Sequence, residues 1–331
     1  MTGLAFACAG EPRADWVARV ERLAWSLRAL GGSAADAPFH ACFAGRVPGE
    51  LLEPLQALDV TVHEVEPFDA RLSYANKLRI LELGSAFDAG VDAVVMIDCD
   101  VVVAGDPAPH LPIASPGAKP ADMDPLGPAD WGALCSALGM PLPPRDVLAS
   151  STGRPMHRYY NSGVVVVPCD RLAAMQDAWA RWLYRVVDML AQDDRLVPRA
   201  RRIFADQYAL MAAMAELGGE PLGVAANCPT HLPLHARAVG AGEPALLHYH
   251  ARAWPSGLLQ RPVAPAARPA AARFNTAWAR ARDLPYAGLQ DPPLRDRVEG
   301  ARARVEDAVR SSRAFTRARA AVAGSRADRV A

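Results

Sequence analysis

The chain has 331 residues, of which 51% are hydrophobic and 22% are charged. This length and composition allow a large buried core, which excludes global disorder and favours one large α/β domain with an extension, or two smaller domains. Lysine plus arginine equals aspartate plus glutamate at 36 residues each, and this balance excludes a dedicated nucleic-acid-binding protein that relies on excess positive charge.

The cysteines and the N-terminal residues bear on the compartment. The six cysteines lie far apart without a CxxC pair, which argues against a zinc or thioredoxin-like motif and favours a reducing environment. The chain does not open on the basic segment of a signal peptide, and no apolar run approaches the roughly 18 residues of a membrane span. We therefore expect a cytoplasmic protein without a transmembrane segment.

The first third of the chain alternates between strand and helix patterns. An apolar run that ends in glycine predicts a strand over 3–10, and an apolar stripe at helical spacing predicts a helix over 12–30. The next expected elements are a strand over 39–45, a short helix over 48–58, a strand over 60–68, a helix over 74–87 and a strand over 91–103. This alternation predicts a doubly wound, mostly parallel sheet, with ligands at the carboxyl ends of its strands.

The remainder of the chain is less regular. Residues 105–155 are rich in proline, glycine and aspartate, and predict a long functional loop with a short helix near 131–139. The later elements are a strand over 158–168, a helix around 179–186, a helix over 204–217 and a strand over 244–254. Residues 261–273 resemble a Pro/Ala linker. We expect one domain over 1–260 and a linker with a basic helical C-terminal extension over 261–331.

The apolar run VVMIDCDVVVAGDP at 94–107 contains two carboxylates, Asp98 and Asp100. Side chains alternate along a strand, so both carboxylates are expected to point the same way while Cys99 points into the packing. Neighbouring buried charges need compensation, which a divalent cation supplies. The structural alternative is that one aspartate caps a turn and the other is solvated.

Several segments in this order resemble the GT-A nucleotide-sugar glycosyltransferases of the family 8 type. They are ANKLRIL at 75–81, DCD at 98–100, RYYNSGVVVVP at 158–168, FADQYAL at 204–210 and LLHYHARAW at 246–254. The resemblance covers about residues 3–257 and implies the Rossmann-like GT-A fold. It also implies metal-dependent transfer of a hexosyl group from a nucleotide-diphosphate donor, expected to be a UDP-sugar, with retention. The acceptor is expected to be a glycan, a lipid-linked molecule or a protein.

By this resemblance, Asp98, Asp100 and His248 are the metal ligands, and Asp98 also contacts the ribose. His250 is expected to share a strand face with His248 and is the substitute ligand. Imidazole with carboxylate and phosphate oxygens suits Mn²⁺, with Mg²⁺ as the other candidate. The structural alternative for His248 is a core histidine that the backbone satisfies.

Lys77, Gly163 and Arg252 are the expected donor contacts. Lys77 would contact the nucleotide or diphosphate, and its alternative is an exposed helix lysine. Gly163 would let a ligand approach the backbone, or would mark a bulge. The family's lysine in this late segment is missing here. Arg252 is the nearest cation and would hold the diphosphate through bidentate hydrogen bonds.

Asn161, Asp206 and Gln207 are the expected contacts around the reacting carbon. The family directs such an asparagine toward the sugar or acceptor, and it places the aspartate of its Asp-Gln segment near the anomeric carbon. A helix N-cap is the structural alternative for Asp206. The family's further asparagine downstream of Gln207 is absent.

Other functions stay open. A haloacid dehalogenase-type phosphatase would use Asp98 as nucleophile and Asp100 as acid/base, although Lys119 and Asp193-Asp194 do not stand where that family needs its lysine and acidic pair. A non-catalytic protein would keep the fold and bind a sugar nucleotide or another protein. The tail over 295–331 holds ten arginines against five acidic residues, and is expected to lie on an anionic membrane surface or to be a solvated or packed helix.

Overall fold

The computed structural model describes residues 3–69, 72–87, 89–192, 204–240 and 242–291. The chain divides into one compact unit over Met1–Leu289 and a second over Gln290–Ala331. The expected basic tail helix and the Asp193-Asp194 pair lie outside the described residues. No helix in the described ranges is both long enough and apolar enough to cross a membrane.

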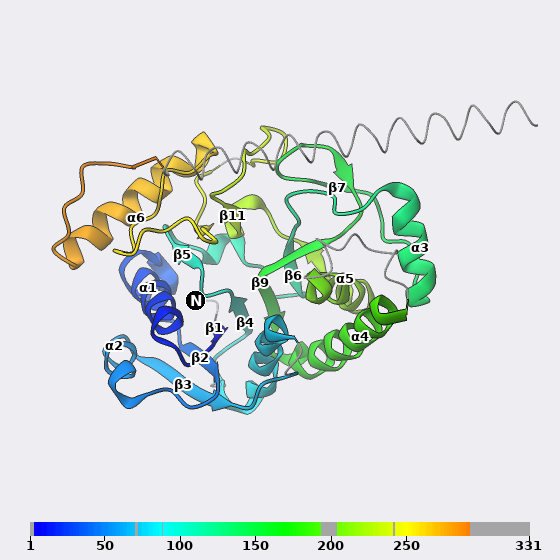
Figure 1. Ribbon diagram of the computed structural model, residues 1–331, viewed down its shortest axis with the longest axis horizontal. Helices are drawn as coiled ribbons and strands as arrows, with labels where there is room; N and C mark the ends of the chain where they lie inside the picture. Colours follow the sequence, from blue (N-terminus) through cyan, green and yellow to red (C-terminus); the bar gives the residue numbers. More distant parts are fainter. Residues whose placement is uncertain (1–2, 70–71, 88, 193–203, 241, 292–331) are drawn as a thin grey trace, which may run out of the picture. The chain divides into compact units, whose positions relative to one another are not determined.

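A seven-stranded sheet forms the centre of the first unit, in the order β10-β6-β9-β4-β1-β2-β3 (Figure 1). Its strands are β1 Leu4–Gly10, β2 Phe39–Ala44, β3 Val60–Val65, β4 Ala93–Ile97, β6 Gly117–Pro120, β9 Tyr160–Pro168 and β10 Glu220–Pro221. Strands β1, β2, β3 and β4 pair in parallel, and β9 runs antiparallel to both β4 and β6. The prediction of an α/β fold with a mostly parallel central sheet is confirmed.

Helices cover both faces of this sheet. They are α1 Ala14–Leu30, α2 Glu53–Gln56, α3 Pro128–Leu138, α4 Leu172–Gln192 and α5 Ala205–Leu217. A sixth helix, α6 Arg268–Ala281, belongs to a separate core. Leu4, Phe6 and Cys8 of β1 pack in the same core as α1, whereas Ala5 and Ala7 point into the core that α3, α4 and α5 share. The sheet is therefore buried on both sides, which explains the continuous apolar runs of its strands.

Short 3-10 helices join these elements. They cover Gly32–Ala34, Gly49–Leu51, Ala108–His110, Cys169–Arg171, Val224–Ala226 and Pro265–Ala267, and a longer one covers Ser73–Ala86. The last replaces the helix predicted over 74–87. Its buried residues Ala75, Leu78 and Leu81 recur every third position, as do the buried Lys77 and Ile80, which matches the three residues per turn of a 3-10 helix.

The strand predicted over 91–103 is divided in two. After β4 the carbonyl of Asp98 accepts a hydrogen bond from Val101 N at 3.1 Å, which closes a turn over the two aspartates. The chain continues as β5 Val101–Val103, which belongs to a separate three-stranded sheet. The aspartates therefore lie on a turn, and strand alternation does not set their directions.

The small sheet consists of β11 Cys228–Pro229, β12 Leu246–His248 and β5. Strand β12 pairs antiparallel to β5 with His248 opposite Val101, so the late histidine segment is brought to the turn that follows β4. The loop over 105–155 also contains a two-stranded sheet of β7 Val147–Leu148 and β8 Pro155–Met156.

The Pro/Ala linker expected over 261–273 is wrong for residues 265–273. These residues form the 3-10 helix Pro265–Ala267 and the first part of α6. Ala270 and Ala271 are fully buried, and α6 packs Phe274 and Trp278 into one core with Leu247. Small alanine side chains allow this helix to approach the small sheet closely, so the composition reflects packing rather than a linker.

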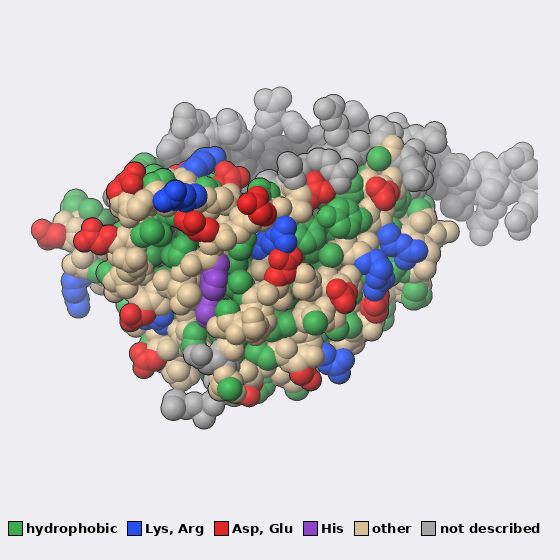
Figure 2. All heavy atoms as spheres, turned by 90° about the horizontal axis from the view of Figure 1, so that it is seen from below, with side chains coloured by type: hydrophobic (Ala, Val, Ile, Leu, Met, Phe, Trp, Pro, Cys, Tyr) green, Lys and Arg blue, Asp and Glu red, His purple; other side chains and the backbone are tan. Residues whose placement is uncertain are grey.

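Acidic and basic side chains are interspersed over the face that Figure 2 shows, and neither sign forms a continuous region there. This agrees with the zero net charge of the chain. Histidine side chains reach the surface on the same face (Figure 2).

Candidate active site

The two aspartates lie where two cavities adjoin at the carboxyl end of β4. We call the first the histidine cavity, because His231, His248 and His250 line it; its volume is about 330 Å³. We call the second the β1 cavity, because Ala9 and Gly10 at the end of β1 line it; its volume is about 280 Å³. Both cavities share the lining residues Tyr74, Lys77, Asp98 and Asp100.

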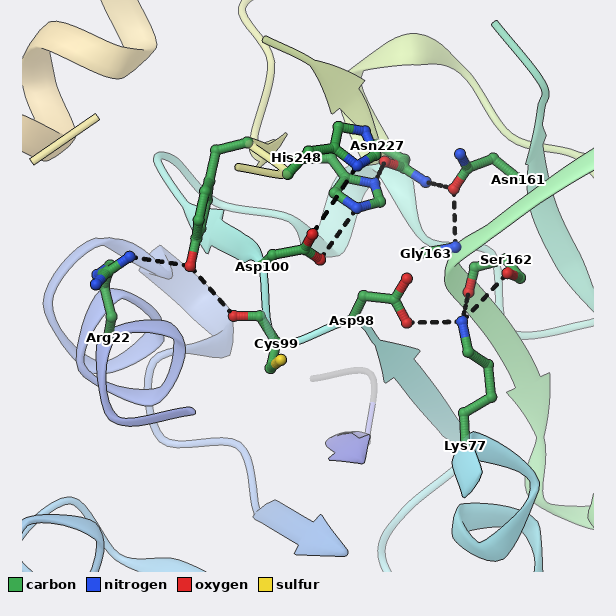
Figure 3. Close-up of polar contacts among 12 residues, drawn as sticks. Arg22, Lys77, Asp98, Cys99, Asp100, Asn161, Ser162, Gly163, Asn227 and His248 are labelled. Atoms are coloured by element: carbon green, nitrogen blue, oxygen red, sulfur yellow. Dashed lines mark hydrogen bonds and ion pairs between the residues drawn. The ribbon is translucent and has the colours of Figure 1, made fainter. Parts of the chain in front are cut away.

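Lys77 binds Asp98 inside this region (Figure 3). Its Nζ donates to Asp98 Oδ1 at 2.7 Å and to the carbonyl and hydroxyl oxygens of Ser162 at 3.2 Å each. Burial lowers the pKa of Lys77, but the carboxylates of Asp98 and Asp206 outweigh burial, so its pKa is raised and the ammonium stays charged. Lys77 is only 9% exposed, so it is not an exposed helix lysine.

Asp206 and Gln207 stand in the first turn of α5, and both line the histidine cavity. The N-cap of α5 is Phe204, so Asp206 does not cap the helix. The Asp206 carboxylate is buried, accepts a hydrogen bond from Ser162 Oγ at 2.6 Å, and lies 3.9 Å from Lys77 Nζ. Burial raises its pKa, and Lys77 opposes that shift only in part.

A chain of hydrogen bonds fixes the orientation of His248 (Figure 3). The backbone N–H of Gly163 donates to Asn161 Oδ1 at 2.8 Å, and Asn227 Nδ2 donates to the same oxygen at 2.9 Å. Because a backbone N–H can only donate, Asn161 Oδ1 is an acceptor and the Asn227 amide must present its Oδ1 to His248 Nδ1, 3.1 Å away. His248 Nδ1 therefore carries the proton and donates to Asn227.

The other ring nitrogen of His248 faces a carboxylate. Nε2 lies 3.1 Å from Asp100 Oδ1, and with the proton on Nδ1 both of these atoms are acceptors. Either a proton or a cation must lie between them. Burial opposes the imidazolium form, but Asp100 outweighs burial and raises the pKa of His248; burial likewise opposes the Asp100 carboxylate, yet His248 holds its pKa well below the ordinary value.

His250 joins this pair. Its ring stacks on that of His248 with centroids 3.8 Å apart, and its Nδ1 lies 3.9 Å from Asp100 Oδ2. Burial and then the neighbouring His248 lower the pKa of His250 to about 2, so its imidazole is neutral. One ligand atom from each of Asp100, His248 and His250 lies within 4.8 Å of the others, which makes them a candidate metal-binding group.

The two histidines come together in a way that differs from the expected shared strand face. Strand β12 ends at His248, and His250 lies beyond it with a φ of 51°. The tight turn after β12, and not strand alternation, places the His250 ring over the His248 ring. His231, which the sequence did not single out, packs edge-on against His250 with ring centroids 4.1 Å apart.

Gly163 makes room for His248. A Cβ atom at this position would lie 2.4 Å from His248 Cε1, so any larger residue would displace the ring. Gly163 also lines the histidine cavity, while the donor contact expected of it stays a prediction.

Arg252 is not among the described residues that line the two cavities. Its backbone N–H donates to Tyr249 O at 2.8 Å in the turn after β12, and the diphosphate contact expected of Arg252 stays a prediction.

Besides His231, the sequence analysis missed Asn227 and Ser162 at this site. Ser162 stands inside the quoted YYNSG segment, so its position was marked although its role was not. Asn227 lies in VAANC, which carries no motif, and it reaches His248 because β11 pairs in parallel with β12. Only the pairing of these two short strands could have identified it.

A family model described as Rhodobacterales glycosyltransferase domain matches residues 22–218. No curated protein matches the sequence.

Among solved structures, the galactosyltransferase LgtC in complex with donor and acceptor sugar analogs aligns with a TM-score of 0.50 and 16% identity, covering 88% of this chain and 99% of LgtC. A structure of an active-site mutant of LgtC aligns with a TM-score of 0.52, at the same identity and coverage. At this identity the likeness concerns the fold.

Proposed function

The chain belongs to the Rhodobacterales glycosyltransferase domain family and is a glycosyltransferase with the GT-A fold, and from this premise we propose that it transfers a hexosyl group from a nucleotide-diphosphate donor in a metal-dependent reaction. The observation that carries the proposal is the pair of facing acceptors, His248 Nε2 and Asp100 Oδ1, 3.1 Å apart where two cavities adjoin. We propose a UDP-sugar as donor and retention at the anomeric carbon. The family assignment sets the phosphatase alternative aside.

The side chains around Asp100 fit a divalent cation. Asp100 carries a charge, and the lone pair of His248 Nε2 is directed at it, which is the combination of oxygen and nitrogen atoms that Mn²⁺ accepts. Asp100 and His248 would hold the ion together with a third protein ligand, for which the sequence implies Asp98. When bound, such an ion neutralises negative charge on the departing diphosphate.

We assign the nucleoside to the β1 cavity. This cavity lies at the carboxyl end of β1, where parallel sheets bind their ligands. The Trp16 ring lines it with Arg19, whose guanidinium carbon lies 5.4 Å from the ring centroid, and together they offer an aromatic face and a cation to a nucleobase. The Asp98 oxygen that does not accept from Lys77 Nζ is available to a ribose hydroxyl.

We assign the transferred sugar to the histidine cavity. Asn161, Asp206 and Gln207 line it and supply acceptors and donors for sugar hydroxyls. The Lys77 ammonium stands 2.7 Å from Asp98 and 3.9 Å from Asp206, at the boundary of the two cavities, so it would stabilise negative charge on the leaving diphosphate. Gly163 and Arg252 complete the proposed donor contacts. An acceptor hydroxyl from a glycan, lipid-linked molecule or protein would enter the same cavity.

The test measures nucleotide release from a panel of UDP- and other nucleotide-sugars with Mn²⁺. We expect turnover, even if only hydrolysis, with at least one donor, and its loss with chelator and in Asp100→Ala. The matched control is Asp146→Ala, which removes a half-exposed carboxylate paired with Arg158 and leaves turnover unchanged. Proton NMR of the product reports the anomeric configuration. Absence of both turnover and nucleotide-diphosphate binding with Mn²⁺ contradicts the proposal.

A further inference from the structure

We propose that His250 is the third protein ligand of the metal ion, which Asp100 and His248 also bind, and that Asp98 stays paired with Lys77 and does not ligate it. This inference rests on the proposed function, because the ion in question is the one shared with the donor diphosphate. It differs from the ligand set of Asp98, Asp100 and His248 that the sequence implies. Distances among the three side chains, the backbone at His250 and the partners of Asp98 support this ligand set.

The distances among the three side chains suit a common ion. Two atoms that each lie about 2.1 Å from one metal ion are at most about 4.2 Å apart. His248 Nε2 lies 3.1 Å from Asp100 Oδ1, and His250 Nδ1 lies 3.9 Å from Asp100 Oδ2. Both separations fall below that limit. The ligand atoms of all three residues lie within 4.8 Å of one another, and the His250 ring must turn out of its stacked position on His248 to direct its lone pair at the shared ion.

The backbone at His250 supports a functional role. Its φ of 51° is a left-handed conformation that costs a non-glycine residue conformational energy, and such conformations gather at functional sites. Hydrogen bonds fix the turn: Tyr249 N donates to Asp100 O at 3.0 Å, and Arg252 N donates to Tyr249 O at 2.8 Å. Glycine would adopt this turn without that cost, and histidine is one of the few other residues enriched in it, so the imidazole here agrees with a use of the ring.

The imidazole of His250 is not committed to other hydrogen bonds. Its Nδ1 is too far from Asp100 Oδ2 for a hydrogen bond, and its Nε2 is buried without a hydrogen-bond partner in the described part of the chain. The side chain as a whole is 36% exposed, but an imidazole whose Nε2 is buried without a hydrogen bond and whose Nδ1 has no close partner among the described residues gains free energy from a ligand. By contrast, Asn227 already occupies Nδ1 of His248.

Asp98 is held elsewhere. Its Oδ1 accepts from Lys77 Nζ at 2.7 Å, and Ser162 anchors the same ammonium through two oxygens at 3.2 Å. The backbone N–H of Asp98 donates to Gly163 O at 2.8 Å, which fixes the residue to β9. Moving the carboxylate to an ion beside Asp100 would leave the buried Lys77 ammonium without its closest counter-charge, which is costly.

This ligand set predicts the preferred metal. Two imidazoles and one carboxylate favour Mn²⁺, Co²⁺ and Zn²⁺ over Mg²⁺, which prefers oxygen ligands. We therefore expect the wild-type protein with UDP to bind Mn²⁺ much more tightly than Mg²⁺. In His250→Asn the ratio of the two dissociation constants should be smaller.

The experiment counts the imidazole nitrogens on bound Mn²⁺ by pulsed electron paramagnetic resonance of the full chain with UDP. We expect two coordinated imidazoles in the wild type and one in His250→Asn, whose asparagine tolerates the left-handed backbone. The Mn²⁺ dissociation constant should rise at least about tenfold in this variant. His248→Asn is the reference for loss of one imidazole, and His231→Asn, the neighbouring ring, should keep both.

Asp98→Asn distinguishes the two ligand sets. We expect it to keep both imidazoles and to change the Mn²⁺ dissociation constant less than about threefold. One imidazole in the wild type, or a tenfold loss in Asp98→Asn without a loss in His250→Asn, overturns the inference and leaves the proposed function intact. Absence of Mn²⁺ binding to the wild type with UDP refutes the proposed function itself. The wild-type imidazole count decides the question even if a variant fails to fold.

Discussion

Replacing Asn227 with leucine tests whether this residue orients a metal ligand. The side chain is only 1% exposed, accepts from His248 Nδ1 at 3.1 Å and donates to Asn161 Oδ1 at 2.9 Å. Leucine has a similar volume but offers neither group, so the His248 Nδ1 proton loses its acceptor inside a site where His248 is only 4% exposed. The ring is then free to turn, or to move its proton to Nε2, and in either case it ligates poorly.

The size of the effect follows from the burial of these groups. A buried donor without a partner costs about 1–3 kcal/mol, so Asn227→Leu should lower the free energy of unfolding by that amount without metal. Removing an outer hydrogen-bond partner of a ligating histidine weakens metal binding about 10–100-fold, which is about 1.4–2.8 kcal/mol of binding free energy. The two effects are separate quantities, and each has its own measurement.

The assays are urea unfolding in the presence of chelator and Mn²⁺ titration in the presence of UDP. The control is Asn227→Asp, which keeps an oxygen for the His248 Nδ1 proton but adds a buried carboxylate. We expect it to lose stability while it keeps Mn²⁺ affinity, because carboxylates serve as outer partners of ligating histidines. If the leucine variant binds Mn²⁺ as tightly as the wild type, or the aspartate variant loses affinity in step with stability, Asn227 acts only through the fold.

Other changes have equally specific expected results. Gly163→Ala should destabilise the protein and weaken Mn²⁺ binding, because the new Cβ would lie 2.4 Å from His248 Cε1. Gly132→Ala, in open space on α3, should instead stabilise the protein by about 0.5–1 kcal/mol. Equal unfolding midpoints for the two variants would contradict this expectation. Burial raises the pKa of the Asp122 carboxyl, but the Lys119 ammonium outweighs burial and holds this pKa below its ordinary value. The ionised carboxylate therefore stabilises the fold above a pH of about 4, and this stability is lost as the pH falls through the folded pKa. In Asp122→Asn the free energy of unfolding should fall less steeply as the pH is lowered through this range. Urea unfolding at several pH values measures this slope for the variant and the wild type, and equal slopes would show that the pair is unimportant. Mn²⁺ with UDP at about 100 times the dissociation constant should add about 2.7 kcal/mol to the free energy of unfolding, and chelator should remove this gain. An unfolding midpoint that changes neither with Mn²⁺ and UDP nor with chelator would count against a metal-bound donor.

The order of strands and helices could be predicted because β1, β2 and β4 are mostly apolar and buried on both faces, whereas the edge strand β3 mixes apolar and polar residues. The break between β4 and β5 could not, because valines continue on both sides of the DCD turn and the composition does not change there. The segment over 74–87 was predicted as an α-helix because its three-residue repeat of apolar positions differs little from the helical pattern over so short a length.

The site was predictable where chemistry is concentrated in sequence. The carboxylates after β4 and the HYH segment after an apolar run are visible without coordinates. The pairing of Lys77 with Asp98 was not, since it depends on how the 3-10 helix Ser73–Ala86 approaches β9. The left-handed backbone at His250 is also invisible in the sequence, because most histidines adopt other backbone angles even though histidine is enriched in this conformation.

The turn after β4 joins two sheets, and this gives its two carboxylates different supports. Asp98 is anchored to the large sheet through Gly163 O, whereas the carbonyl of Asp100 accepts from Tyr249 N on the side of the small sheet. Repacking α6, for example at Trp278, would therefore disturb Asp100 and leave Asp98 in place. Mutations remote from the cavities can in this way adjust one carboxylate independently of its near neighbour, and a selection for altered metal use should find them in α6.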